Sequence, residues 1–205
     1  MFRGAKIQAR DFTRHNDLRD PTGHGTANAS LLVAQGNGWI LGKVPTCILL
    51  FGKVLIQGDR YASEKAIAQG IRWAFFKGAD LIVLPFGTLH GSYIIAREIR
   101  NAAQADCRIL AAAGNCGPSV IAFPALLKEV IAVSALGADG NVYPGCCQRK
   151  EVDIFVPGQD IPAVNADGYV KLNGSSPAAI LAAAAIARHE IEMNSERPCL
   201  EAEEN

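Results

Sequence analysis

The chain has 205 residues, and its 20 Lys and Arg balance 20 Asp and Glu, so its formal net charge is zero. This length suits one domain or at most two small ones. The balanced charge argues against a nucleic-acid binder that works through a basic surface. No apolar run is long enough to cross a membrane, and the N-terminal residues lack the apolar core of a signal peptide. We therefore expect a cytoplasmic protein with no nucleic-acid or membrane partner.

The cysteine pattern does not indicate a structural zinc site, because no C-x-x-C pair occurs. The spacing favours reduced cysteines in a cytosolic protein, and a redox or metal-binding role is the alternative. No group of carboxylates has the pattern of a calcium loop. We therefore expect neither a metal nor a cofactor. The six cysteines are Cys47, Cys107, Cys116, Cys146, Cys147 and Cys199.

Strand-like and helix-like segments alternate along most of the chain. The expected strands are 6–12, 46–56, 80–84, 108–113, 130–135 and 152–156, with a hairpin of strands 161–164 and 169–172; the expected helices are 26–35, 63–77, 92–105 and 177–192. Ser63 is expected to cap the second helix. This alternation predicts an α/β fold with a largely parallel sheet covered on both faces. We expect one domain at 1–193, followed by a polar tail at 194–205.

Three short segments place chemically useful side chains at strand ends or helix starts, where parallel sheets bind their ligands. His24, between two glycines, offers a general base near neutral pH. Asn115 follows a buried strand and can donate a hydrogen bond to an oxyanion. Ser175 and Ser176 open an apolar helix, whose N-terminus favours negative charge near the hydroxyl. Each segment alone is a common turn or helix cap, but together they predict acyl transfer.

The order and context of these segments resemble the subtilisin-like serine proteases (the subtilases, peptidase family S8). Gly23-His24-Gly25-Thr26 resembles the family's histidine motif, and Ala111-Ala-Ala-Gly-Asn115 resembles its oxyanion motif. Gly174-Ser175-Ser176 resembles its serine motif, with Ser176 in the nucleophile position. Pro85-Phe86-Gly87 resembles its substrate-binding segment. The resemblance covers nearly the whole chain and implies a three-layer α/β/α fold.

The resemblance implies an intracellular serine endopeptidase that acts on a peptide or protein substrate. Ser176 would attack the peptide carbonyl, His24 would take its proton, and Asn115 would donate to the oxyanion. Pro85 lacks the N–H with which a β-paired substrate backbone would bond, and this favours narrow specificity or a processing role over broad digestion.

The catalytic aspartate of the family normally ends a strand that precedes the one expected here at 6–12, and no such strand is found. Asp11, Asp17 and Asp20 are expected to be solvated or turn-capping carboxylates. The missing strand would be central, so we expect a gap whose unpaired backbone groups each cost on the order of 1 kcal/mol or more. A partner chain, a strand-swapped copy, a rearranged strand carrying Asp11, or a segment before residue 1 could fill it.

A binding module is the second interpretation of the sequence. A catalytically impaired pseudoprotease would keep the subtilase-like fold and bind another polypeptide in its cleft or along its open sheet, as an added strand. The feature that separates the two interpretations is a carboxylate within hydrogen-bond reach of the His24 ring, which an enzyme should have and a pseudoprotease need not.

Overall fold

The computed structural model describes residues 1–13, 16–55 and 62–195. The expected elements are confirmed, with boundaries shifted by a few residues. They are β1 (Lys6–Asp11), α1 (His24–Val33), β2 (Ile48–Lys53), α2 (Glu64–Phe76), β3 (Leu81–Leu84), α3 (Tyr93–Ala103), β4 (Arg108–Ala112), β5 (Val130–Leu136), β6 (Ile154–Pro157), β7 (Ile161–Asn165), β8 (Gly168–Leu172) and α4 (Ser175–Ser195). The predicted cap is present, since the Ser63 side chain accepts a hydrogen bond from the backbone N–H of Ala66.

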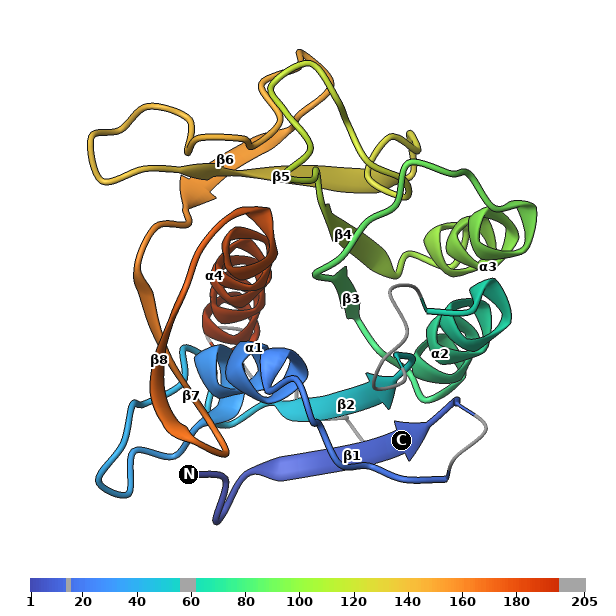
Figure 1. The fold of residues 1–205 in the computed structure, drawn as a ribbon. Coiled ribbons are helices and arrows are strands. Elements are labelled where there is room, and N and C mark those ends of the chain that lie inside the picture. Colours follow the sequence, from blue (N-terminus) through green and yellow to red (C-terminus); the bar gives the residue numbers. More distant parts are fainter. Residues whose placement is uncertain (14–15, 56–61, 196–205) are drawn as a thin grey trace, which may run out of the picture.

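The strands form two parallel sheets and one separate hairpin, which lies beside α1 (Figure 1). The larger sheet has the order β3-β4-β5-β6, and β1 pairs with β2 in the smaller one; all of these pairs are parallel. The hairpin β7–β8 is antiparallel, as predicted. The predicted α/β class is therefore confirmed. Helix α4 extends to Ser195, and residues 196–205 of the predicted tail lie outside the described part of the chain.

Helices cover both faces of the larger sheet and thereby make three layers (Figure 1). On one face, Ile71 of α2 and Ile99 of α3 share a core cluster with Ile82 and Ile109 of the sheet. On the other face α4 packs against Leu110 of β4 mainly through alanines. Small side chains let a helix backbone approach a sheet closely. The N-terminus of α4 lies beside the carboxyl end of β3, where Ser176 contacts Pro85.

Helix α1 is held in place by the hairpin. The Ser30 hydroxyl donates to the carbonyl oxygen of Ala27 (2.7 Å) and accepts from the backbone N–H of Val164 in β7 (3.0 Å). Ser30 is fully buried, so these bonds satisfy a hydroxyl that would otherwise destabilise the fold. The contact ties the second half of α1 to the hairpin.

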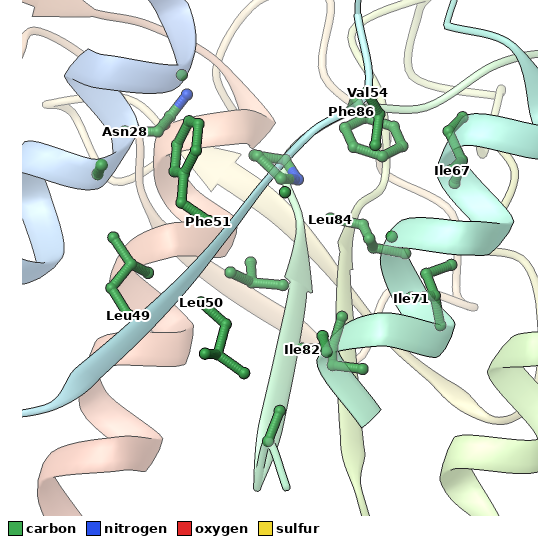
Figure 2. A pocket seen from close by; sticks show the side chains of 18 of the residues that line it. Asn28, Leu49, Leu50, Phe51, Val54, Ile67, Ile71, Ile82, Leu84 and Phe86 are labelled. Carbon is green, nitrogen blue, oxygen red and sulfur yellow. The ribbon is translucent and has the colours of Figure 1, made fainter. Parts of the chain in front are cut away.

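The two parallel sheets do not join. Among the described residues, β2 pairs with β1 alone and β3 pairs with β4 alone. Both line a cavity of about 1070 Å³ (Figure 2). The alternative in which β1 carries Asp11 into the centre of the sheet is wrong, because β1 takes the edge of β2 away from β3. Between the described strands, the expected gap is present.

Candidate active site

Asp20 fixes the N-terminus of α1, where His24 lies. The residue before the helix, Gly23, has a left-handed backbone (φ 69°) and offers no side-chain cap. The Asp20 carboxylate takes that role by accepting from the backbone N–H and the hydroxyl of Thr26, both at 2.7 Å, and from the Thr22 hydroxyl (3.0 Å). Such a cap stabilises a helix by about 1 kcal/mol. The other two candidate carboxylates also cap turns, since Asp11 accepts from Thr13 and Asp17 from Arg19.

The His24 ring contacts Asn28, one turn further along α1. The Asn28 amide nitrogen donates to the carbonyl oxygen of His24 (2.9 Å) and lies 3.1 Å from its Nε2. Asn28 is only 3% exposed, and its Oδ1 is buried without a hydrogen-bond partner in the structure. Within the described residues, no carboxylate oxygen hydrogen-bonds to the ring. His24 is therefore an exposed base whose ring orientation depends on an amide.

The cavity wall beside His24 influences the protonation of its ring, although the residue is exposed. Partial desolvation lowers the pKa of the ring below its ordinary value of 6.5, and the negative charge of Asp20 opposes that shift without cancelling it. The ring is therefore neutral at physiological pH and able to accept a proton.

We expect NMR titration of the His24 ring to give a pKa below 6.5, because desolvation penalises the imidazolium. The unfolded chain then binds the proton more tightly than the folded chain. As the pH falls below about 6.5, the free energy of unfolding should decrease until the ring is protonated in both states. Asp20→Asn should lower the pKa further. A wild-type pKa above 6.5 would contradict this account of the ring's surroundings.

Ser175 and Ser176 have different surroundings at the start of α4. Ser175 is 1% exposed, and its hydroxyl donates to Asn115 Oδ1 (2.9 Å) and accepts from the backbone N–H of Gly114 (3.2 Å). The half-buried Ser176 hydroxyl donates to the carbonyl oxygen of Pro85 (2.7 Å). Ser176 is thus the serine that an incoming group can reach, and Ser175 supports the neighbouring loop.

Three donors fix the amide orientation of Asn115. Its Oδ1 accepts from the backbone N–H of Ser175 (3.0 Å), the Ser175 hydroxyl (2.9 Å) and the Cys146 thiol (3.1 Å). An NH₂ group in that position would face three donors, so the amide has one favourable orientation. Nδ2 therefore points away from this cluster, and the Asn115 side chain is exposed. The arrangement presents an N–H donor at the surface, close to Ser176.

Gly174 leaves room for this amide. A Cβ added at Gly174 would lie 2.8 Å from Asn115 Nδ2 and 2.9 Å from Oδ1, and the residue has a φ of +99°. Any other residue would strain the backbone and push the amide aside. Steric crowding by Asn115 thus explains why a glycine precedes the two serines.

The predicted site residues come together only in part. Asn115 and Ser176 lie together through Ser175, and Ser176 reaches the first residue of the Pro85-Phe86-Gly87 segment. His24 lines the same cavity as that segment. The hydroxyl of Ser176 does not bond to His24 here, because the carbonyl of Pro85 accepts its proton.

Sequence reasoning missed the supporting residues Cys146 and Asn28. Cys146 is distant in sequence from Asn115, and no motif links them. Asn28 had a weak signal, since it lies four residues after His24 in a predicted helix and therefore on the same face. Within 1–13, 16–55 and 62–195, no group of three or more His, Cys, Asp or Glu could hold a metal ion. In those same ranges, no helix is both long and apolar enough to span a membrane.

Known proteins that are similar in sequence to this chain include proteases. The chain is 32% identical over 163 residues to a thermostable alkaline protease of Halalkalibacterium halodurans, covering 78% of this chain and 44% of that protein. It is 30% identical over 176 residues to the major intracellular serine protease of Bacillus subtilis, covering 82% and 55%. The chain therefore spans about half the length of the curated relatives it matches.

Solved structures show the same fold. A mutant of the protease domain of PatA superposes with a TM-score of 0.85 at 24% identity, over 94% of this chain and 75% of that one. The prenylagaramide maturation protease PagA superposes with a TM-score of 0.81 at 22% identity, over 94% and 71%. The family model described as the subtilase family, Peptidase_S8, matches residues 6–198. The chain therefore belongs to the subtilase family of serine peptidases.

Proposed function

We propose that this chain is the part of a serine endopeptidase that carries the nucleophile, the base and the oxyanion donor. Ser176 Oγ attacks the peptide carbonyl and passes its proton to His24, which then gives it to the leaving amine. The tetrahedral oxyanion accepts hydrogen bonds from Asn115 Nδ2 and from the backbone N–H of Ser176. Water hydrolyses the acyl-enzyme in the reverse sequence of steps. The observation that carries this proposal is the fixed amide of Asn115, whose free N–H group lies beside the accessible serine.

Two side-chain movements complete the catalytic geometry. The Ser176 hydroxyl leaves the carbonyl of Pro85, which a rotation about χ1 allows, and the His24 ring turns from Asn28 toward the serine. Hydrogen bonds of this kind are often absent without substrate and tighten when it binds. A carboxylate on the imidazole would hold the ring in its productive orientation. We propose that a partner chain or a second copy supplies that carboxylate.

The substrate is a peptide or protein, bound along Pro85, Phe86 and Gly87. Pro85 has no N–H and its carbonyl faces Ser176, so this segment offers an extended substrate fewer backbone hydrogen bonds. That favours narrow specificity or the processing of one peptide. We propose a cytoplasmic location, which agrees with the relative named as an intracellular serine protease.

One observation favours a second candidate function. Among the described residues, the His24 ring contacts an amide and has no carboxylate as a hydrogen-bond partner. A pseudoprotease that binds polypeptides without cutting them needs no carboxylate there, and the open edges of β2 and β3 suit such binding.

Labelling with a fluorophosphonate probe tests the proposal. Probe attachment to the purified chain and to Ser119→Ala, an exposed control serine, is expected, and Ser176→Ala should lose it. Attachment requires an activated nucleophile, so it separates an enzyme from a pseudoprotease. Absence of labelling from the folded protein, both purified and in lysate, would contradict the enzyme and favour the pseudoprotease.

A further inference from the structure

We propose that Cys146 is a positioning residue of the active site, whose thiol proton keeps the Asn115 amide turned so that its N–H faces the reacting carbonyl. The serine chemistry of this chain then depends on a protonated cysteine that does not touch the substrate. The inference deepens the proposed function and rests on it for the role of the oxyanion donor. The orientation of the amide is inferred from contacts in the structure alone.

A side-chain amide serves as an oxyanion donor in only one of its two orientations. A half-turn about the last bond of the Asn115 side chain exchanges Oδ1 and Nδ2, and would present to the substrate an oxygen that repels an oxyanion. The preference between the two orientations comes from the groups that contact the inner end of the amide. Those groups are the Ser175 N–H, the Ser175 hydroxyl and the Cys146 thiol.

The two contacts from Ser175 do not select the orientation equally. The backbone N–H can only donate, so it favours the amide oxygen at 3.0 Å. The hydroxyl donates to Oδ1 at 2.9 Å, but a hydroxyl also accepts, and a rotation of its proton would let it accept from Nδ2 instead. It already accepts from the Gly114 N–H (3.2 Å). The hydroxyl therefore tolerates a flipped amide, and a further donor strengthens the selection.

The surroundings of Cys146 leave its proton for Asn115. Its Sγ lies 3.1 Å from Oδ1. Burial raises the pKa of the thiol, so it is protonated at physiological pH, and backbone hydrogen bonds from Ala135 and Ser175 oppose this shift. N–H groups that donate to sulfur have this effect. Because N–H groups face the sulfur, its own proton goes to the amide oxygen, and a flipped amide would place Nδ2 against a donor.

The turn that carries Cys146 is tied to the loop that carries Asn115. Two backbone hydrogen bonds, of 2.8 Å and 3.2 Å, join the loop 114–117 to the turn 145–147, one on each side of Cys146 in the sequence. Cys146 is 1% exposed and packs in the core cluster that includes Val133. The backbone and the packing both hold the residue, so its thiol does not leave the amide without breaking other contacts.

Cysteine suits a buried position that must still donate a hydrogen bond. The sulfur packs in an apolar cluster with Ala178 and Ala179 of α4, where cysteine behaves as a small hydrophobe with a weak S–H donor. Serine in its place keeps a donor and loses volume, whereas alanine loses both. The comparison of Cys146→Ser with Cys146→Ala therefore separates hydrogen bonding from packing.

Fluorophosphonate labelling of Ser176 measures the effect, because the phosphonyl oxygen takes the place of the oxyanion. Cys146→Ala should lower the labelling rate by about 3–10-fold, the size of one net hydrogen bond, and Cys146→Ser should restore it to within about twofold of the wild type. Cys107→Ala is the matched control and should not change the rate. It truncates another buried cysteine, whose thiol contacts the carbonyl oxygen of Arg108. If Cys146→Ala fails to fold, Cys146→Val fills the site without a donor.

The same substitution in an Asn115→Ala background shows whether Cys146 acts through the amide. Without the amide the thiol has nothing to orient, so Cys146→Ala should then change the labelling rate by less than about 1.5-fold. An equal loss in both backgrounds would mean that Cys146 only packs the core, and would overturn the proposal.

The unfolding equilibrium gives a test that needs no activity. Cys146→Ala should raise the unfolding constant by about 3–10-fold more in the wild type than in the Asn115→Ala background, because the bond between thiol and amide exists only in the former. Asn115→Asp keeps an oxygen in the position of Oδ1, so Cys146→Ala should have its full effect in that background.

The two measurements distinguish failure of this proposal from failure of the proposed function. A labelled wild type whose rate Cys146→Ala leaves unchanged would overturn the positioning role and leave the peptidase standing. A wild type without labelling would contradict the peptidase. Coupling between Cys146 and Asn115 in unfolding would then still support orientation of the amide by the thiol, and its absence would overturn it.

Discussion

Replacing Asn115 by aspartate is expected to slow the acylation of Ser176 by a factor of about 10²–10³ or more, the usual loss when one oxyanion donor is removed. The free energy of unfolding should change by less than about 1 kcal/mol. The effect on acylation and the effect on stability are separable because the oxygen and the nitrogen of this amide have different roles. Oδ1 accepts from Ser175 and Cys146, and Nδ2 is free to donate to a substrate.

Aspartate keeps the shape of the side chain and the oxygen that accepts all three bonds. It replaces the N–H donor by a charged acceptor that repels the developing oxyanion. Asn115→Ala is the matched control, since it removes the donor and also leaves the Ser175 N–H and hydroxyl without their acceptor, at a cost of about 1–3 kcal/mol. Labelling rates and urea unfolding measure both effects. Asn115→Asp that retains wild-type labelling would show that this amide is not the oxyanion donor.

Local signals in the sequence were enough to predict most of the fold. The apolar run that ends at Leu84 indicates a buried strand, and the apolar residues of Glu64–Phe76 recur with the spacing of a helix. These patterns are readable because burial in a layered fold requires apolar residues at the period of the element. The turn residues from Asn165 to Gly168 likewise predicted the position of the hairpin. The ends of helices were less predictable. Helix α1 begins at His24, two residues before the predicted start, because the cap comes from Asp20 and not from the residue directly before the helix.

The candidate site was predictable where each residue has a signal of its own, and not where its role depends on distant contacts. His24, Asn115 and Ser176 each stand in a recognisable segment. Cys146 has no such segment, because its role comes from the turn that carries its thiol to Asn115. The gap between β2 and β3 was expected from the resemblance, but the apolar lining from α2 and α4 was not, since it depends on how the helices pack over both sheets.

Leu110→Ala is expected to lower the free energy of unfolding by about 3–5 kcal/mol, the largest single loss we expect from a core truncation here. Leu110 is fully buried in β4 and shares its cluster with Ala178, Ala179, Ala182 and Ala183 of α4. The cost of a cavity depends on how far the surroundings can collapse into it. Alanines have no side chain that can swing into the space, so on the α4 side the cavity closes only if the helix moves as a whole.

The neighbouring residue provides the comparison. Ile109 is equally buried in the same strand but faces Ile71 and Ile99, whose longer side chains can shift into a cavity, so Ile109→Ala should cost less, about 2–3 kcal/mol. The exposed Leu126→Ala should cost under about 0.5 kcal/mol.

Urea unfolding measures each loss, and the slope of the unfolding free energy against urea concentration should not change. The melting temperature should fall by about 2–4 °C for each kcal/mol lost. A loss at Leu110 smaller than that at Ile109 would mean that α4 moves toward the sheet. The unpaired edge of β3 would permit such a movement, because nothing among the described strands ties it to β2.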